Sequence, residues 1–201
     1  MKNFLFAIPQ QPEKNLWETM YMNPCRNPLL ECPKATRFPI LVLVRNTVKK
    51  NEKIVITAIE QDHINCRINA ETFMKELEAL KAEIGFEYEL HKVPTPFSET
   101  IDDHLNLFSD MIDNVHNEDT LYTDITFGTK PIPIIMLMTL TYAYRFKEDI
   151  SIETIVYGQL NHDTGVSSLF DVSALFFMNA TINTMGETAD PEKFIKGMID
   201  L

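Results

Sequence analysis

Short apolar segments alternate with longer segments of helical periodicity about five times along this chain, and this alternation constrains the fold most strongly. Strands are expected at residues 3–8, 53–59, 86–93, 120–126 and 150–157. Helices are expected at residues 38–48, 69–84, from 98 onward, 131–146 and 171–185. Such an order favours an α/β protein in which helices cover both faces of a mostly parallel central sheet.

Two of the expected helices show apolar residues at helical spacing. These residues are Phe73, Leu77, Leu80 and Ile84 in the helix at 69–84, and Ile101, Leu105, Phe108 and Ile112 in the helix that begins at Ser98. Each set is expected to share one face of its helix. With 45% hydrophobic residues in 201, the chain has enough apolar surface for one sizeable core. We therefore expect one domain at residues 1–185 and a short C-terminal helical tail at 186–201.

The charge balance limits the partners that this chain is expected to bind. Its formal net charge is −11, which disfavours general binding to duplex DNA or to an anionic membrane surface. No apolar run reaches the roughly 18 residues of a membrane-spanning helix. A small anionic ligand needs only a local group of N–H donors and a cation, so it stays compatible with the sequence.

The cysteines favour neither a disulfide framework nor a zinc site. There are three of them, Cys25, Cys32 and Cys66, and no Cys-x-x-Cys pair occurs. We expect reduced thiols, a cytoplasmic protein, and neither a bound metal nor a cofactor.

The segment DITFGTKPIP at residues 124–133 joins the fourth expected strand to a helix. Gly128 allows a sharp turn or a close approach of the backbone to a ligand. The free N–H groups of the following helix attract anions, and Lys130 adds a positive charge there. Thr126 and Thr129 offer hydroxyls to a phosphate or a ribose. The segment favours a phosphate- or sugar-binding loop, and an ordinary strand-to-helix turn is the alternative.

Other nucleotide-binding motifs are absent from the sequence. Neither G-x-G-x-x-G nor G-x-x-x-x-G-K-[ST] occurs, and the chain has only six glycines. The sequence therefore disfavours a dinucleotide-dependent dehydrogenase and a P-loop enzyme.

The same segment resembles the signature D-x-T-x-G-[FT]-[RK]-x-x-P of the CRISPR-associated Rossmann-fold (CARF) family. The resemblance extends over residues 53–185: IETIVYG at 152–158 is similar to the family's next strand, and LFDV at 169–172 is similar to the segment before its last helix. Two features differ from the commonest form of the signature. Phe127 stands where a histidine is usual, and Thr129 with Lys130 replaces Phe-Arg.

The resemblance implies a Rossmann-like three-layer sandwich that forms a homodimer and binds cyclic tetra- or hexa-adenylate, the second messenger of type III CRISPR antiviral defence. In this interpretation Gly128, Thr129 and Lys130 contact a phosphate, and Thr126 contacts a ribose or base. The edge of the first strand contacts adenine. The residues expected at the ligand are Ala7, Ile8, Pro9, Gln10, Gln11, Asp124, Thr126, Phe127, Gly128, Thr129, Lys130, Gly158 and Gln159.

Three functions stay open on the sequence. The first is a dimeric sensor that binds the ring and acts through a separate effector. The second is a metal-independent ring nuclease, in which Thr129 orients the attacking 2′-hydroxyl and Lys130 stabilises the developing charge. The third is a regulatory or structural partner that binds no nucleotide. Whether the protein is an enzyme is therefore open at this point.

Overall fold

The computed structural model describes residues 1–161, 164–184 and 196–197. Most of the helical tail expected at 186–201 lies outside these residues. The strands are β1 (Lys2–Ala7), β2 (Lys53–Gln61), β3 (Glu87–Thr95), β4 (Thr120–Asp124), β5 (Ser151–Leu160) and β6 (Ser167–Asp171). The helices are α1 (Pro39–Thr47), α2 (Ile64–Ile84), α3 (Ile101–Asp113), α4 (Pro131–Phe146) and α5 (Ser173–Thr184), with 3₁₀ turns η1 (Glu13–Asn15) and η2 (Pro28–Leu30).

The six strands form one sheet in the order β3-β2-β1-β4-β5-β6. The pairs from β3 through β5 are parallel, and β6 runs antiparallel to β5. The chain builds the sheet outward from β1 to β3, then crosses back and continues from β4. The carboxyl ends of β1 and β4 therefore flank the switch point of the sheet, where ligands bind in folds of this type.

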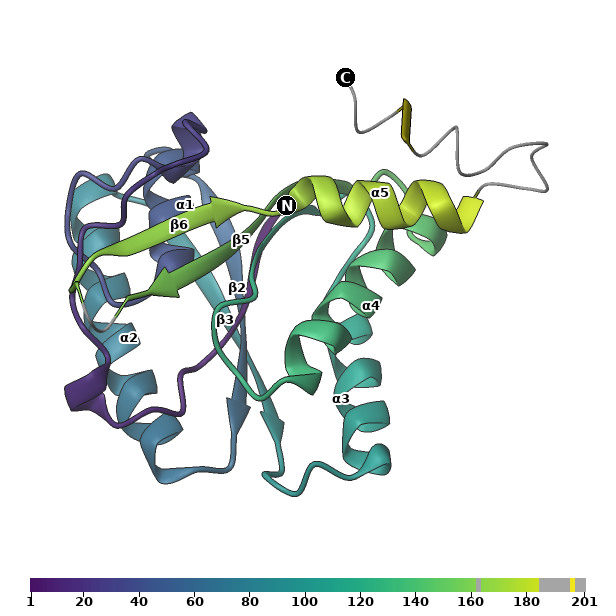
Figure 1. Ribbon diagram of the computed structural model, residues 1–201, viewed down its shortest axis with the longest axis horizontal. Helices are drawn as coiled ribbons and strands as arrows, with labels where there is room; N and C mark the ends of the chain where they lie inside the picture. The colour runs from purple at the N-terminus through teal and green to yellow at the C-terminus, as the bar shows by residue number, and fades with distance from the viewer. Residues whose placement is uncertain (162–163, 185–195, 198–201) are drawn as a thin grey trace.

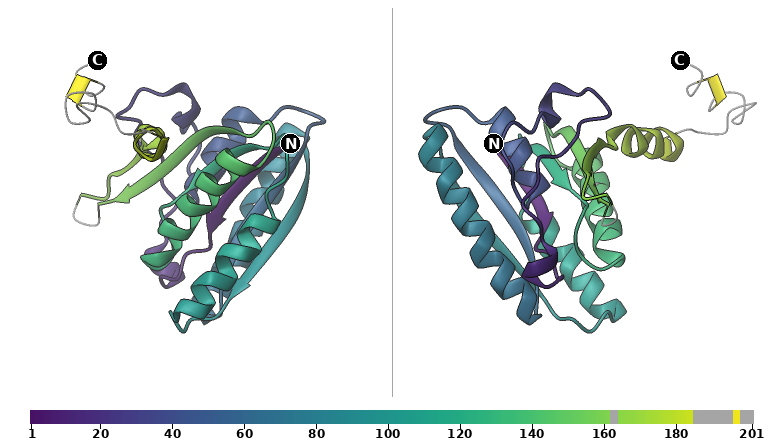
Figure 2. Two further views of the ribbon diagram at one scale, coloured as in Figure 1. Left: turned by 90° about the vertical axis from the view of Figure 1, so that its right-hand side faces the viewer. Right: turned by 60° about the vertical axis from the view of Figure 1, so that its left-hand side comes forward.

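Helices cover both faces of the sheet, as the alternation in the sequence predicts. Figure 1 shows α1 and α2 on one side and α3 and α4 on the other, and the turned views of Figure 2 show the same layers. The buried side chains of β1 alternate accordingly. Phe4 and Phe6 pack in the core beneath α1 and α2, while Leu5 and Ala7 pack in the core beneath α3 and α4. The expected Rossmann-like three-layer sandwich is confirmed.

Most element boundaries differ by a few residues from those expected, and β5 for example continues to Leu160 instead of 157. α2 begins at Ile64 instead of 69, because the ring of His63 caps the helix by accepting a hydrogen bond from the backbone nitrogen of Asn65. α3 begins at Ile101 instead of 98, with Thr100 as its capping residue. Strand β6 is absent from the expected elements, and its last residue is the first residue of the segment expected to form the last long helix.

The apolar row expected on α3 is wrong at two of its four positions, because Phe108 packs against the core and Ile112 is half-buried, but the other two residues are exposed. Ile101 is 69% exposed and Leu105 is 55% exposed, whereas Leu107 and Met111 are buried. The helix carries two overlapping apolar rows, and the row that includes Leu107 and Met111 faces the sheet. α3 packs beside α4, which exposes Ile134. The exposed side chains of Ile101, Leu105 and Ile134 therefore give the outer surface of these two helices an apolar character.

Within the part of the chain that the structure describes, no helix combines the length and the apolar character that a membrane span requires.

Candidate functional site

The carboxylate of Asp124 joins the end of β4 to two other segments. One of its oxygens accepts a hydrogen bond from the backbone nitrogen of Thr126 at 2.8 Å. The other oxygen accepts from the backbone nitrogen of Ile40, in the first turn of α1, at 3.2 Å. The side chain is fully enclosed, and this burial raises the pKa of Asp124 to about 6, against the lowering effect of its hydrogen bonds. Asp124 thus fixes the backbone of the loop, because both of its carboxylate oxygens accept hydrogen bonds from backbone nitrogens.

Thr126 ties the loop to β5. Its hydroxyl oxygen accepts a hydrogen bond from the backbone nitrogen of Gly158 at 2.7 Å. A β-carbon at position 158 would lie 3.1 Å from the side chains of Thr126 and Pro39. Glycine at this position therefore permits the close approach of β5 to the loop.

The rest of the loop turns toward the start of α4. Phe127 is buried in the core beneath α1 and α2 and anchors the loop. Gly128 has a φ of 101°, a conformation that favours glycine. Lys130 occupies the position before α4 without making a capping hydrogen bond; it is exposed and forms no hydrogen bond or ion pair with another residue within the described ranges. The loop thus presents an unpaired cation at a helix N-terminus, which is the arrangement that suits an anion.

The loop after β1 is held by amide side chains of α2. Asn69 is completely buried, and its amide nitrogen donates to the carbonyl oxygens of Pro9 at 2.8 Å and Gln11 at 3.0 Å. Asn65, one turn earlier, donates to the carbonyl oxygen of Gln10 at 2.8 Å. These contacts fix the backbone of residues 9–11 beside the carboxyl end of β1.

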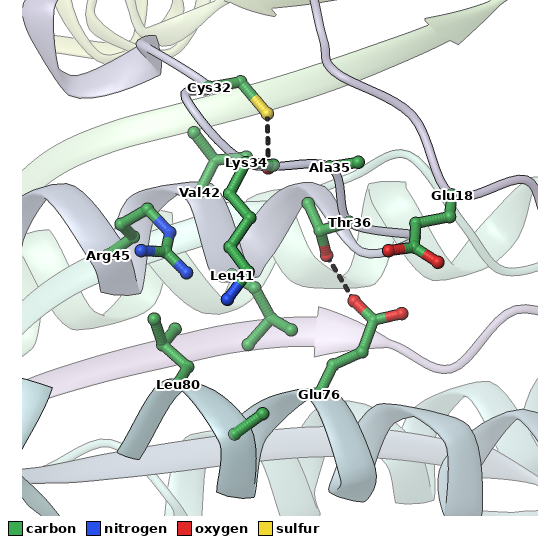
Figure 3. A pocket seen from close by; sticks show the side chains of 11 residues that line it. Glu18, Cys32, Lys34, Ala35, Thr36, Leu41, Val42, Arg45, Glu76 and Leu80 are labelled. Atoms are coloured by element: carbon green, nitrogen blue, oxygen red, sulfur yellow. Dashed lines mark hydrogen bonds between the residues drawn. The ribbon is translucent and has the colours of Figure 1, made fainter. Parts of the chain in front are cut away.

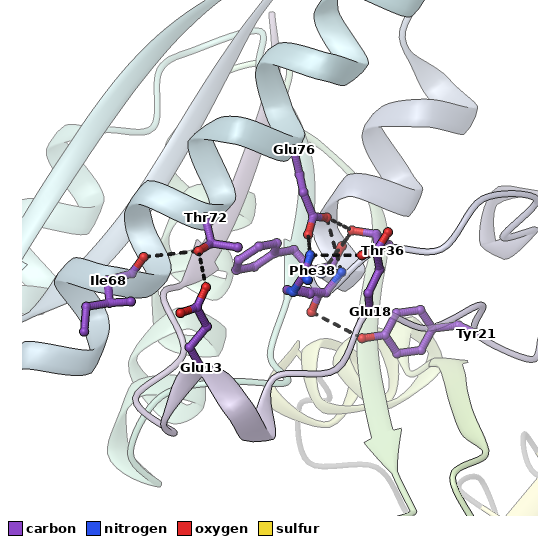
Figure 4. Close-up of polar contacts among 9 residues, drawn as sticks. Glu13, Glu18, Tyr21, Thr36, Phe38, Ile68, Thr72 and Glu76 are labelled. Carbon is purple, nitrogen blue, oxygen red and sulfur yellow. Dashed lines mark hydrogen bonds and ion pairs between the residues drawn. The ribbon is translucent and has the colours of Figure 1, made fainter.

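Two further residues on the same face of α2 hold the rest of this connection. Figure 4 shows Thr72, whose hydroxyl donates to Glu13 at 3.1 Å, and Glu76, which accepts from the hydroxyl of Thr36 at 2.6 Å. The guanidinium of Arg37 also donates to Glu76 at 2.8 Å. With Asn65 and Asn69, Thr72 and Glu76 form a polar row along α2. This row holds the connection between β1 and α1, residues 9–38, by hydrogen bonds.

A hollow of about 150 Å³ lies between α1, α2 and this connection, as Figure 3 shows. Its charged groups are engaged with protein partners. Lys34 and Arg45 both pair with Glu83, and Glu76 is held as described above. These pairs stabilise the packing of α1 and α2 against residues 9–38, so we assign this hollow a structural role.

A second hollow, of about 270 Å³, lies at the switch-point edge of the sheet. The residues that line it are Gln11, Asn15, Thr126, Phe127, Gly158 and Leu160. It therefore brings the loop after β1 together with the loop after β4 and with β5, three segments that are far apart in the sequence. The position of this hollow, beyond the carboxyl ends of β1 and β4, matches that of ligand sites in open α/β sheets.

The structure places the thirteen sequence-predicted ligand residues in three settings. Gln11, Thr126, Phe127 and Gly158 line the hollow at the switch point. Gly128, Thr129 and Lys130 follow Phe127 directly, and Gln159 is an exposed residue of β5. The others are more enclosed: Ala7, Ile8, Pro9 and Asp124 are buried and Gln10 is half-buried. No ligand tests these assignments, so they stay predictions.

Several residues of this edge were missed in the sequence. Asn15 and Leu160 line the hollow, and Asn65 and Asn69 hold its loop. The signal for the last two was present, because positions 65, 69, 72 and 76 recur at helical spacing and all carry polar groups. Among residues 1–161, 164–184 and 196–197, no group of three histidine, cysteine, aspartate or glutamate side chains is placed to hold a metal ion.

The fold and the hollow at the switch point together define a Rossmann-like α/β protein. The segment DITFGTKPIP at residues 124–133, called the signature loop below, lies at the switch point of its sheet. No family model matches the sequence. A segment of 87 residues, 42% of the chain, is 30% identical to the CRISPR-associated protein MJ1674 of Methanocaldococcus jannaschii. The matched segment spans 14% of that protein's length, so the similarity links this chain to a small part of a longer CRISPR-associated protein.

Proposed function

We propose that this chain is a CRISPR-associated sensor that binds cyclic tetra- or hexa-adenylate as a homodimer. The observation that carries the proposal is the position of the DITFGTKPIP loop, which begins at the end of β4 at the switch point and carries Lys130, a cation without a partner among the described residues. The similarity to a CRISPR-associated protein supports the same biological context.

Phosphate recognition rests on the start of α4. Lys130 supplies a full positive charge, and Gly128 leaves the backbone of the turn uncovered by a side chain. The first turn of α4 adds few donors of its own, because Pro131 and Pro133 lack an N–H and the N–H of Ile132 donates to the carbonyl oxygen of Thr129 at 3.0 Å. One phosphate of the ring would take the backbone N–H groups of the turn at residues 128–130 together with Lys130.

The dimer follows from the symmetry of the ligand. A ring of four or six adenylates can carry a twofold axis, and a cleft across such an axis presents equivalent halves to it. The exposed apolar side chains of Ile101, Leu105 and Ile134 support a second copy on the outer surface of α3 and α4.

A ring nuclease is the second candidate, and one observation favours it. The amide nitrogen of Gln61 lies 3.5 Å from the hydroxyl of Thr129 and 3.4 Å from the carboxylate of Glu99, which itself pairs with His104 at 3.3 Å. A carboxylate–imidazole pair close to the signature loop is a candidate general base for the 2′-hydroxyl. Lys130 would stabilise the charge that develops on the phosphate.

Incubation of the protein with cyclic tetra- and hexa-adenylate in EDTA, followed by chromatography of the nucleotides, separates the candidates. An intact ring that co-elutes with a dimer supports the sensor. Linear oligoadenylates that form in the wild type but not in Thr129→Val support the nuclease. If neither ring binds or changes, the nucleotide proposal fails and a partner without nucleotide is left.

A further inference from the structure

A larger hollow, of about 520 Å³, lies next to the signature loop, beyond the carboxyl ends of β2 and β3. The residues that line it are Glu60, Gln61, Asp62, Cys66, Arg67, Pro94, Thr95 and Pro96. None of these residues belongs to the predicted ligand set. The hollow touches the proposed site through Gln61, whose amide faces Thr129 of the loop.

Gln61 is the unusual member of this lining. The residue is 5% exposed, and its side-chain carbonyl oxygen, Oε1, is buried and has no hydrogen-bond partner among the described residues. The amide nitrogen faces the oxygens of Thr129 and Glu99 at 3.5 and 3.4 Å, which is the long limit for a hydrogen bond. These two contacts assign the orientation of the amide. A buried acceptor without a donor is unfavourable, and a ligand that donates to it would satisfy it.

The charges around the hollow argue against a phosphate. Arg67 pairs with Asp62 at 2.6 Å, and Lys92 of the neighbouring strand β3 pairs with Glu60 at 3.0 Å. Burial raises the pKa of Cys66 to about 11, so its thiol is neutral. The walls include the rings of Pro94 and Pro96, which offer flat apolar surfaces. An uncharged, flat group with N–H donors fits this lining.

We propose that this hollow is a purine-base subsite in which Gln61 reads adenine, and this rests on the oligoadenylate function proposed above. Adenine presents an amino group at C6 beside the acceptor N7. The carbonyl oxygen of Gln61 accepts from the amino group, and its amide nitrogen donates to N7, which is the paired contact that glutamine makes with adenine. The amide has two N–H donors, so one of them can keep its contact with Glu99.

The test compares two rings of the same size by titration calorimetry. One is cyclic oligoadenylate, and the other carries unsubstituted purine, which lacks the amino group, in place of adenine. Wild type is expected to bind the adenine ring about tenfold or more tightly than the purine ring. Gln61→Leu is expected to lose this preference while it keeps the affinity for the purine ring. Gln61→Asn, which withdraws the amide by one methylene, should show the same loss and serves if the leucine variant does not fold.

The outcomes separate the subsite from the function on which it rests. If wild type binds the adenine ring and the Gln61 variants keep the full preference, the subsite is refuted and the proposed function stands. The subsite is also refuted, and the function again stands, if wild type binds both rings equally. If wild type binds neither ring, the oligoadenylate function fails, and the adenine subsite fails with it.

Discussion

The carboxylate of Asp124 accepts a hydrogen bond from the backbone nitrogen of Ile40, 84 positions earlier in the chain. The same carboxylate accepts from Thr126, so one buried side chain fixes both the start of α1 and the course of the signature loop. The first position of the signature, which reads as a ligand contact in the sequence, is here engaged with the protein itself.

Asp124 should couple stability to pH. Its pKa is raised from 3.8 to about 6 by burial, so between these values the folded state binds more protons than the unfolded state. The contribution of this side chain is complete below about pH 4 and is lost as the pH rises through 6. We expect the stability difference between wild type and Asp124→Asn, measured by urea unfolding, to fall by up to about 3 kcal/mol from pH 4 to pH 7.

Subtracting the stability curve of Asp124→Asn from that of wild type cancels the other carboxyl groups, which titrate equally in both proteins. A difference that is constant over this pH range, or that grows with pH, would contradict the raised pKa of Asp124.

Asn69 should be the main support of the loop after β1. Asn69→Ala leaves the carbonyl oxygens of Pro9 and Gln11 without their donor and opens a buried space, so we expect a loss of about 1–3 kcal/mol in the free energy of unfolding. Asn65→Ala is the matched control, because it removes an amide of the same helix that holds only Gln10. Urea unfolding should show the smaller loss for the control. Equal effects of the two substitutions would refute the special role of Asn69.

Much of this fold could be predicted from the sequence, because periodicity reports the layer in which a residue lies. The apolar run of β1 marks a central strand that is buried on both faces, and α4 begins and ends where its pattern predicts. Gly85 ends α2 in the left-handed conformation that favours glycine. By contrast, β6 has no strong pattern of its own, since its pairing with β5 depends on the hairpin that carries it.

The site was predictable only in part, for a physical reason. A signature gives the residues of one loop, and Lys130 and Gly128 are visible in it without any structure. The partners of the loop come from other strands, and no local spacing reports that Gly158 donates to Thr126 or that Gln61 faces Thr129. The wrong prediction at Ile101 and Leu105 on α3 has a similar cause, because two apolar rows overlap there and only packing selects the buried positions.

Leu105 should contribute to self-association. It is 55% exposed on α3, so Leu105→Lys is expected to lower dimerisation without lowering the melting temperature. Sedimentation velocity over a range of concentrations measures the first, and a thermal melt measures the second. Ile68→Lys on α2, where the side chain is 40% exposed, is the control on the opposite layer. A dimer weakened by the control but not by Leu105→Lys would place the interface elsewhere.

Lys130 should carry the electrostatic part of ring binding. The side chain is exposed and unpaired in the part of the chain described, so Lys130→Ala is expected to keep the fold and to weaken the binding of cyclic oligoadenylate by about 1.5–3 kcal/mol. Lys130→Arg keeps the charge and should retain most of the affinity. Lys147→Ala, at the other end of α4, changes the net charge equally and is the matched control. Calorimetry at two salt concentrations should show a weaker salt dependence for Lys130→Ala than for Lys147→Ala, and equal affinities of these two variants would exclude a phosphate contact by Lys130.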